Sequence, residues 1–163
     1  MSKGKFSNKA AQNFLKTLPV TSVESSKLVK RTKFNFSFFD FEQPKGLDAE
    51  LSREFFNELF QKLKHFSAES LAHWNAAPAG KGDGNYLEVY GGFPKRSNFT
   101  HPPFVPEDAV WGRFRLDRTV RLAGFTIPNG LNHKFCENER YRHCTNTFYV
   151  VFIDFHHGFY VTK

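Results

Sequence analysis

The stretch Phe148-Tyr-Val-Val-Phe-Ile-Asp-Phe-His-His-Gly-Phe-Tyr160 decides the fold of this chain of 163 residues. Its first six side chains are apolar or aromatic without interruption, which is typical of a strand that is buried on both faces. Polar groups begin at Asp154 and continue with His156, His157 and Tyr160. We therefore expect a buried strand whose end carries two imidazoles and a phenol.

A second run, Trp111-Gly-Arg-Phe-Arg-Leu-Asp-Arg-Thr-Val-Arg-Leu-Ala-Gly-Phe125, predicts two strands joined by a turn. If the turn has two residues, Arg115 and Arg121 point to opposite faces and the cations are dispersed. If the loop has three residues, Arg115 lies directly across from Arg121, with Arg113 on the same face. Like charges at opposed positions destabilise a sheet, so the second register makes sense mainly where an anion or a carboxylate lies between them. We favour the second register.

The segment ahead of these strands predicts one strand and two helices. Aromatic rings alternate along residues 33–41, which is typical of a strand that places them on one face. These rings are Phe34, Phe36 and Phe38. Asp48 is a suitable N-cap for a helix that extends to residue 66, and Ser67 can cap a second helix that ends before Pro78.

Together these elements predict an α+β fold in which a helical hairpin covers an antiparallel sheet of about four to five strands. A short strand at 86–90 and a long irregular segment at 91–110 separate the helices from the arginine-rich strands. We expect one domain at residues 32–163 and a basic, partly flexible arm at residues 1–31. Residues 1–33 hold eight basic side chains and one acidic one, and so account for the whole formal net charge of +7. Such an arm suits a nucleic acid or an acidic protein.

Composition argues against several classes of protein. There is no run of about 18 apolar residues and no charged-then-apolar N-terminal segment, which argues against a membrane span and a secretory signal. Cys136 and Cys144 are the only cysteines, and two thiols do not make a disulfide scaffold. We expect a cytoplasmic protein that does not enter a membrane.

The histidines, the tyrosine and the arginines are suited to cutting RNA without a metal. An imidazole, with a pKa of about 6.5, takes and returns protons near neutral pH. In such a reaction a base activates the ribose 2′-hydroxyl, cations stabilise the phosphorane, and an acid protonates the departing 5′-oxygen. The structural alternative is that His156 and His157 only satisfy backbone carbonyls at the end of the strand.

Two thiols and two imidazoles also lie within a dozen residues of one another. They are His133, Cys136, His143 and Cys144. Zinc accepts such donors in a tetrahedron. Adjacent residues of an extended chain point in different directions, however, and the spacing matches no standard zinc finger. We therefore favour a polar loop between two strands, at residues 128–146, which is called here the excursion. We expect no metal or other cofactor.

The ending His157-Gly-Phe-Tyr160 matches the H-x-x-Y ending of HigB-like proteins. With a basic strand at 113–122 ahead of an apolar strand, the chain resembles the RelE and HigB group of toxin ribonucleases. The resemblance implies a RelE-like fold, cleavage of messenger RNA and a partner antitoxin that neutralises the activity. It also implies that His157 or Tyr160 transfers a proton while the arginines contact phosphate.

The leading prediction is a metal-independent endoribonuclease of toxin type that acts on RNA and is controlled by an antitoxin. The predicted catalytic residues are His157, Tyr160 and Arg121. The predicted substrate-binding residues are Arg113, Arg115, Lys95, Arg96 and His156. The alternative is a non-catalytic module that binds nucleic acid or protein through the basic arm and through surfaces rich in phenylalanine, of which the chain has 21.

Overall fold

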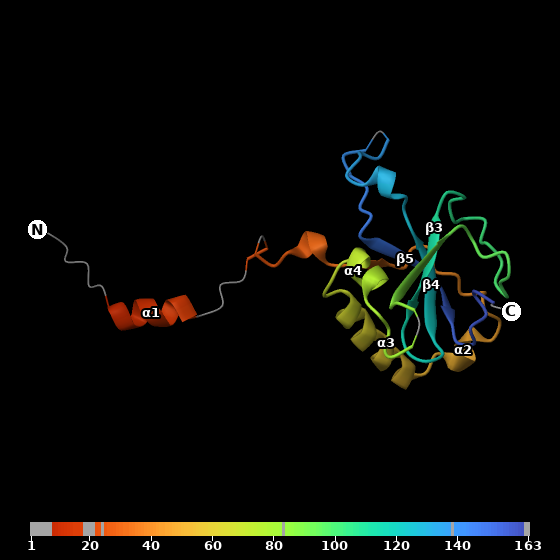
Figure 1. Cartoon of the computed structure of the whole chain (residues 1–163), viewed down its shortest axis with the longest axis horizontal. Helices are drawn as coiled ribbons and strands as arrows, with labels where there is room; N and C mark the ends of the chain where they lie inside the picture. Colours follow the sequence, from red (N-terminus) through yellow and green to blue (C-terminus); the bar gives the residue numbers. More distant parts are fainter. Residues whose placement is uncertain (1–7, 18–21, 24, 83, 138, 162–163) are drawn as a thin grey trace, which may run out of the picture.

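A five-stranded sheet forms the centre of the computed structural model, which describes residues 8–17, 22–23, 25–82, 84–137 and 139–161. The strands lie in the order β1-β5-β4-β3-β2 (Figure 1). They are β1 (Lys33–Asn35), β2 (Leu87–Gly91), β3 (Val110–Arg115), β4 (Arg121–Thr126) and β5 (Thr147–Asp154). The α-helices among the described residues are α1 (Lys9–Thr17), α2 (Leu47–Glu50), α3 (Arg53–Phe66) and α4 (Leu71–Ala76), and the short 3-10 helices are η1 (Leu28–Lys30) and η2 (Asn129–Leu131).

The sheet is mixed rather than antiparallel. The pairs β2–β3, β3–β4 and β4–β5 are antiparallel, whereas β1 pairs parallel to β5. The prediction of an α+β fold is thus confirmed, and the prediction of a wholly antiparallel sheet is wrong at β1. The alternation of apolar side chains identifies a strand, but it carries no information about the direction of the strand beside it.

The last strand is buried on both faces, as its sequence predicts. Phe148, Val150 and Ile153 belong to one core cluster, and Val151 and Phe152 belong to the other. Consecutive residues of a regular strand point to opposite faces. Here β4 pairs with Val150 and Phe152 but skips Val151, and this β-bulge allows Val151 and Phe152 to share one cluster.

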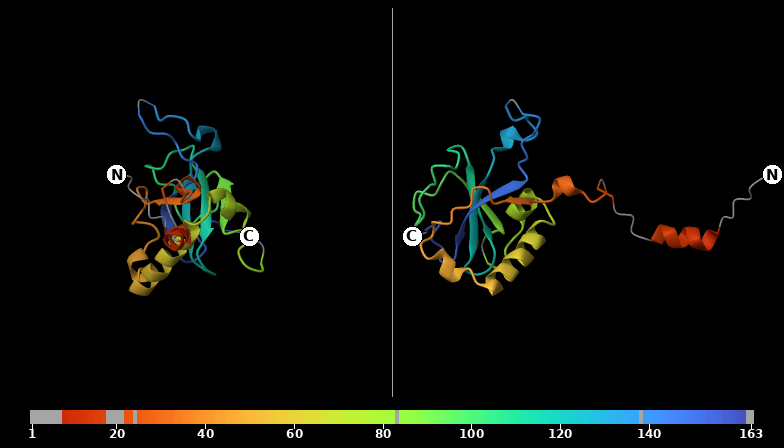
Figure 2. Two further views of the ribbon diagram at one scale, coloured as in Figure 1. Left: turned by 90° about the vertical axis from the view of Figure 1, so that its left-hand side faces the viewer. Right: turned by 180° about the vertical axis from the view of Figure 1, so that it is seen from behind.

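Different segments cover the two faces of the sheet. Helices α3 and α4 cover one face, called here the helix face (Figures 1 and 2), where Phe66 and Trp74 pack on Phe114 of β3 and its neighbours. The other face, called here the loop face, is covered by the irregular segment 92–109 and by Phe159 near the C-terminus. The two faces therefore present different chemistry to the solvent.

Both predicted helix caps differ from the observed ones. Asp48 lies within the separate short helix α2, and Ser52 caps α3 by accepting a hydrogen bond from a backbone N–H at 3.0 Å. Ser67 ends α3 instead of starting α4, and Ser70 caps α4 through a backbone N–H at 3.1 Å. Several residues near each helix start are able to cap, and the packing of the apolar helix side selects among them.

Residues 33–41 do not form one strand. Strand β1 ends at Asn35, whose side-chain oxygen accepts a hydrogen bond from the N–H of Ser37 at 2.8 Å and turns the chain. Phe34 consequently packs on the helix face, while Phe38 packs on the loop face. The prediction that these rings share one face is therefore wrong.

The N-terminal helix α1 lies away from the sheet (Figures 1 and 2), and its Phe14 side chain is 64% exposed. The predicted flexible arm at residues 1–31 also includes residues 1–7, 18–21 and 24, which lie outside the described residues. Among the helices that the structure describes, none is long and apolar enough to cross a membrane.

Candidate functional site

The arginine-rich strands pair in the register that brings their cations together. Arg115 lies directly across from Arg121, and Arg113 lies across from Ala123. The loop between the strands spans three residues, because Leu116 and Val120 are joined by a backbone hydrogen bond of 3.1 Å. The favoured register is confirmed, and it places three guanidinium groups on the loop face.

A carboxylate that the sequence prediction missed lies between two of these cations. Glu88 of β2 pairs across the strands with Arg113, so both side chains point to the loop face. Its Oε2 accepts hydrogen bonds from Arg113 Nε at 3.1 Å and Nη2 at 2.8 Å. Its Oε1 lies 3.8 Å from Arg115 Nη2. Glu88 thus places a negative charge between Arg113 and Arg115 of β3, whereas Arg121, which is opposed to Arg115, forms no ion pair with Glu88 among the described residues.

Two stacked tyrosines adjoin this ion pair. Tyr90 follows two residues after Glu88 on the same face, and its hydroxyl donates a hydrogen bond to Glu88 Oε2 at 3.1 Å. The Tyr90 ring lies 5.7 Å from Arg113 Cζ. The ring of Tyr160 stacks on Tyr90 with a centroid distance of 4.5 Å and an interplanar angle of 6°. The five residues Glu88, Tyr90, Arg113, Arg115 and Tyr160 are called here the tyrosine–arginine cluster.

The C-terminal segment brings Tyr160 to this place by pairing with the irregular segment of the loop face. Asn98 N donates a hydrogen bond to Gly158 O at 2.8 Å, and Val161 N donates one to Arg96 O at 3.1 Å. The backbone at Arg96 therefore lies beside Tyr160. Two of the predicted substrate contacts, Lys95 and Arg96, belong to the segment that holds the tyrosine in position.

The environment fixes the protonation of the cluster. Burial raises the pKa of Glu88, but the hydrogen bonds and charge of Arg113, with help from Tyr90 and Arg115, outweigh it and leave that pKa below its usual range. Burial raises the pKa of Tyr90, and the negative charge of Glu88 raises it further against the opposing charge of Arg113. At neutral pH the cluster therefore contains an ionised carboxylate and a neutral phenol.

The cluster is open to solvent. Tyr160 is 39% exposed, and the side chains of Arg115 and Glu88 are 26% and 27% exposed. Arg113 is more enclosed, at 16%. An aromatic face, two guanidinium groups and a carboxylate are thus within reach of a ligand on the loop face.

Arg121, predicted to be catalytic, has a different role. It is only 4% exposed, and its Nη1 donates hydrogen bonds to the carbonyl oxygens of Asp117 and Val120, both at 2.9 Å. Its Nη2 donates to Arg118 O at 3.3 Å. Burial lowers the pKa of Arg121, and the charge of Arg115 lowers it further. Arg121 therefore holds the turn between β3 and β4 and is not available to a substrate.

The two histidines occupy a turn that Asp154 organises. The buried carboxylate of Asp154 accepts hydrogen bonds from the backbone N–H groups of His156, Gly158 and Phe159 at 3.1, 2.9 and 2.8 Å. His157 has a φ of 56° in this turn and is exposed. Within the described chain, no hydrogen bond or ion pair joins either histidine to the tyrosine–arginine cluster.

His156 faces a different element. Its Nε2 lies 3.6 Å from Glu50 Oε1 of α2, and its side chain is 76% exposed. The predicted convergence of both histidines with the arginines is therefore wrong for His156, because the Asp154 turn directs it toward α2. Tyr160, two residues beyond Gly158, is the ring that reaches the arginines.

The four side chains considered as zinc ligands, His133, Cys136, His143 and Cys144, lie in the excursion between β4 and β5. His133 and His143 are joined through their backbones, with His133 N donating to His143 O at 3.0 Å. Cys144 Sγ accepts a hydrogen bond from Lys33 Nζ at 3.7 Å. Over the part of the chain that the structure describes, no three His, Cys, Asp or Glu side chains are grouped to hold a metal.

Glu88 and Tyr90 were missed although the sequence carries a signal for them. The two residues lie two positions apart in the short strand β2, so both side chains point to the same face of the sheet. Arginine side chains on a neighbouring strand are stabilised by an acidic side chain opposite them. Which strand lies next to β3 was not evident from the sequence.

Comparisons with protein-family models, with curated proteins and with solved structures find no match to this chain.

Proposed function

We propose that this protein is a metal-independent endoribonuclease of toxin type and that the tyrosine–arginine cluster is its RNA site. The observation that carries the proposal is the stacking of Tyr160 on Tyr90 beside Arg113. Exposed aromatic faces stack with the bases of single-stranded RNA, and guanidinium groups bind phosphate. A base on Tyr160 and a phosphate on Arg115 would occupy neighbouring positions on the loop face.

The proposed reaction assigns one proton transfer to each of two groups. The ionised carboxylate of Glu88 takes the proton of the ribose 2′-hydroxyl, and the 2′-oxygen forms a bond to phosphorus. Arg115 and Arg113 stabilise the charge of the phosphorane. The bond from phosphorus to the 5′-oxygen breaks, and this oxygen takes the proton of the Tyr160 hydroxyl. The products are a 2′,3′-cyclic phosphate and a 5′-hydroxyl, and solvent returns the proton from Glu88 to Tyr160.

His157 is a second candidate for the acid, since it is exposed at the same end of the chain as Tyr160. Lys95 and Arg96 would contact phosphates further along the strand. A partner antitoxin would inhibit the protein by covering the tyrosine–arginine cluster. Substitution at Tyr160 and at His157 separates the two candidate acids.

The test is cleavage of a fluorescent single-stranded RNA by the full chain in the presence of EDTA. Tyr160→Phe keeps the stacked ring and removes the hydroxyl, so the rate should fall about 10²-fold or more. Tyr141→Phe, at a tyrosine that is 73% exposed in the excursion, is the matched control and should cleave normally. A wild-type chain that binds but never cuts RNA, or full activity in Tyr160→Phe with loss in His157→Ala, contradicts this assignment of Tyr160.

A substitution at an arginine tests the phosphate contact separately. Arg115→Gln should raise KM for RNA, while Arg118→Gln, in the exposed turn, should leave it unchanged. If both substitutions weaken RNA binding equally, the cations act only through net charge and the cluster is not the site.

The second candidate is a non-catalytic module that binds a nucleic acid or a partner protein. It is favoured by exposed phenylalanines on both the arm and the body of the protein. These are Phe14, Phe36, Phe41, Phe56, Phe60, Phe104 and Phe135. In this case deletion of residues 1–31 should remove most of the affinity and its salt dependence, while Tyr160→Phe should do little.

A further inference from the structure

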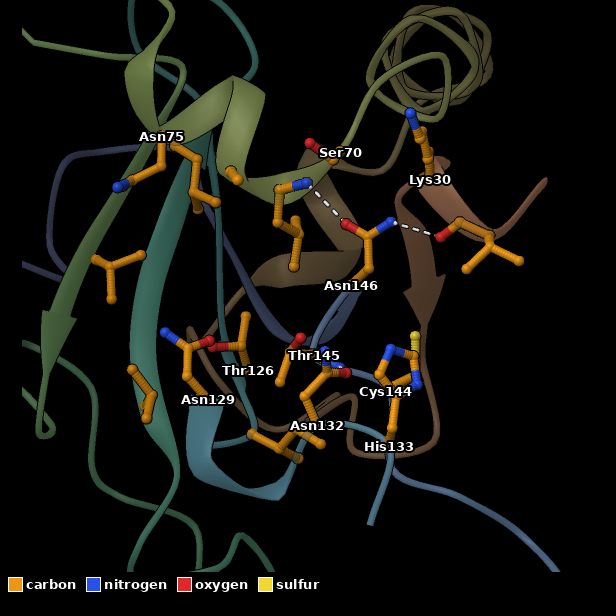
Figure 3. Close-up of a pocket in the computed structure, with 17 residues that line it drawn as sticks. Lys30, Ser70, Asn75, Thr126, Asn129, Asn132, His133, Cys144, Thr145 and Asn146 are labelled. Atoms are coloured by element: carbon orange, nitrogen blue, oxygen red, sulfur yellow. Dashed lines mark hydrogen bonds between the residues drawn. The ribbon is translucent and has the colours of Figure 1, made fainter. Parts of the chain in front are cut away.

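The helix face carries a cavity of about 500 Å³ that is separate from the tyrosine–arginine cluster (Figure 3). Its apolar floor includes Leu87 and Val89 of β2 and Val110 of β3. Val89 lies between Glu88 and Tyr90 in the strand, so it points to the opposite face from them. One wall is α4, and the other is formed by η2 and the base of the excursion before β5. Cavities of this size are usual for small ligands.

None of the 17 residues that line the cavity is acidic. The ionisable lining residues are Lys30, His133 and Cys144, and the remaining polar ones carry carboxamides and hydroxyls. The polar lining residues are Lys30, Ser70, Asn75, Thr126, Asn129, Asn132, His133, Cys144, Thr145 and Asn146. Such a lining favours an anionic ligand with hydrogen-bonding groups and apolar surface over a cation.

One of the four asparagines builds the cavity wall. Asn146 Oδ1 accepts a hydrogen bond from Leu71 N at 2.8 Å, and its Nδ2 donates one to Val29 O at 3.3 Å (Figure 3). This side chain therefore ties β5, α4 and η1 together. With both ends of its amide engaged, Asn146 has a structural role.

Two other asparagines have carboxamides that are free to bind a ligand. Among the described residues, the side chains of Asn75 and Asn129 have no hydrogen-bond partner, and neither has the hydroxyl of Thr126, which also lines the cavity. Asn132 Oδ1 accepts a hydrogen bond from Thr145 N at 3.3 Å, which leaves its Nδ2 as a donor. The residues that carry these unpaired groups thus line one cavity.

The cavity has two chemically different ends. In Figure 3 Asn75 and Asn129 lie on one side of it, and Lys30, near the top, and His133, near the bottom, lie on the other. Cys144 lies beside His133 and brings a further cation, because its Sγ accepts the hydrogen bond from Lys33 Nζ. A ligand that fits must have an uncharged hydrogen-bonding part and an anionic part, joined across an apolar surface.

We propose that this cavity binds a ribonucleoside monophosphate. The flat base lies on the valines of the floor, and the carboxamides of Asn75 and Asn129 hydrogen-bond its edge. A carboxamide offers one donor and one acceptor side by side, which matches the edge of a nucleobase. The phosphate lies on the side that carries His133 and the Lys33–Cys144 hydrogen bond, with Lys30 further along the same side. The site is independent of the proposed cleavage site on the loop face.

The test is calorimetric titration of the full chain with the four ribonucleoside monophosphates, with the best-bound nucleoside alone, and with inorganic phosphate. At least one monophosphate should bind saturably, and more tightly than either fragment. Asn129→Ala should weaken that binding about tenfold, as loss of a carboxamide-to-base contact does. Lys30→Ala should weaken binding of the monophosphate but not of the nucleoside. The matched controls are Asn57→Ala and Lys62→Ala on α3, which should bind as the wild type does.

Two further variants keep the proposal falsifiable. Asn129→Asp conserves the shape of the side chain while replacing its donor, so it should weaken binding even where Asn129→Ala alters the fold. Tyr160→Ala, which removes the stacked ring of the tyrosine–arginine cluster, should leave monophosphate binding unchanged. The proposal is overturned if no monophosphate binds, if inorganic phosphate binds as tightly as the best monophosphate, or if Asn129→Asp and Asn57→Ala have equal effects. Loss of binding in Tyr160→Ala would place the nucleotide at the cluster and also overturn it.

Discussion

Replacement of Glu88 by glutamine should destabilise the protein in a manner that depends on pH. The substitution keeps the size of the side chain and removes the charge that lies between Arg113 and Arg115. Hydrogen bonds that involve a charged group contribute about 1.5–3 kcal/mol, against about 0.5–1.5 kcal/mol for neutral ones. Two bonds from Arg113 would each lose about 1 kcal/mol. Since the paired side chains are 16% and 27% exposed, screening reduces the total to about 1–2 kcal/mol.

The sign of the pH dependence follows from the lowered pKa of Glu88. A carboxyl group whose pKa is lower in the folded state stabilises the fold above its unfolded pKa, here about 4.5. That contribution is lost as the pH falls below 4.5 and through the folded pKa. The gap between wild type and Glu88→Gln should therefore be full at neutral pH and should narrow under acid conditions.

Urea unfolding followed by circular dichroism measures this gap. For an m-value of about 2 kcal/mol/M, the midpoint of Glu88→Gln should lie about 0.5–1 M below that of the wild type at neutral pH. Glu107→Gln, at an exposed position of the irregular segment, is the control and should shift the midpoint little. A gap of equal size at neutral and at acid pH, or no gap at all, would refute the role assigned to the Glu88 charge.

Three other substitutions test the packing that positions the site. Gly124→Ala should cost about 3 kcal/mol in thermal or urea unfolding, because the added methyl would collide with the carbonyl oxygen of Tyr149, whereas Gly130→Ala, with open space around it, should change stability by less than about 0.5 kcal/mol. Asp154→Ala should cost about 3–5 kcal/mol, since three backbone N–H groups in a buried turn lose their acceptor; equal stability of variant and wild type would contradict this. Ser52→Ala should cost about 1 kcal/mol through loss of the α3 cap, and an unchanged unfolding midpoint would exclude that cap.

The sequence was most informative where the side-chain pattern is local. The uninterrupted apolar run predicts that β5 is buried on both faces, and the spacing of apolar residues predicts the body of α3. The charges of Arg115 and Arg121 favoured the register that the structure has. In each case the deciding contacts lie within one element or one hairpin, so a short window contains the necessary information.

The sequence was least informative about which distant segments meet. Glu88 reaches Arg113 only because β2 is the neighbour of β3, and Tyr160 reaches Tyr90 only because the last residues pair with the segment around Arg96. The cavity on the helix face likewise depends on where α4 ends over the sheet. None of these pairings can be predicted from the spacing of side chains within a single segment.

The sequence by itself determined an α+β fold with a buried final strand, a basic arm and arginines gathered on one hairpin. Tertiary structure alone decided that β1 runs parallel to β5, that Arg121 holds a turn, and that Tyr160 joins the arginines while His156 faces α2. The physical reason is that the spacing of apolar side chains and the clustering of charges are properties of residues that are neighbours in the sequence. The direction of an edge strand and the partners of a surface side chain are set by which packing of the whole chain best buries its apolar surface.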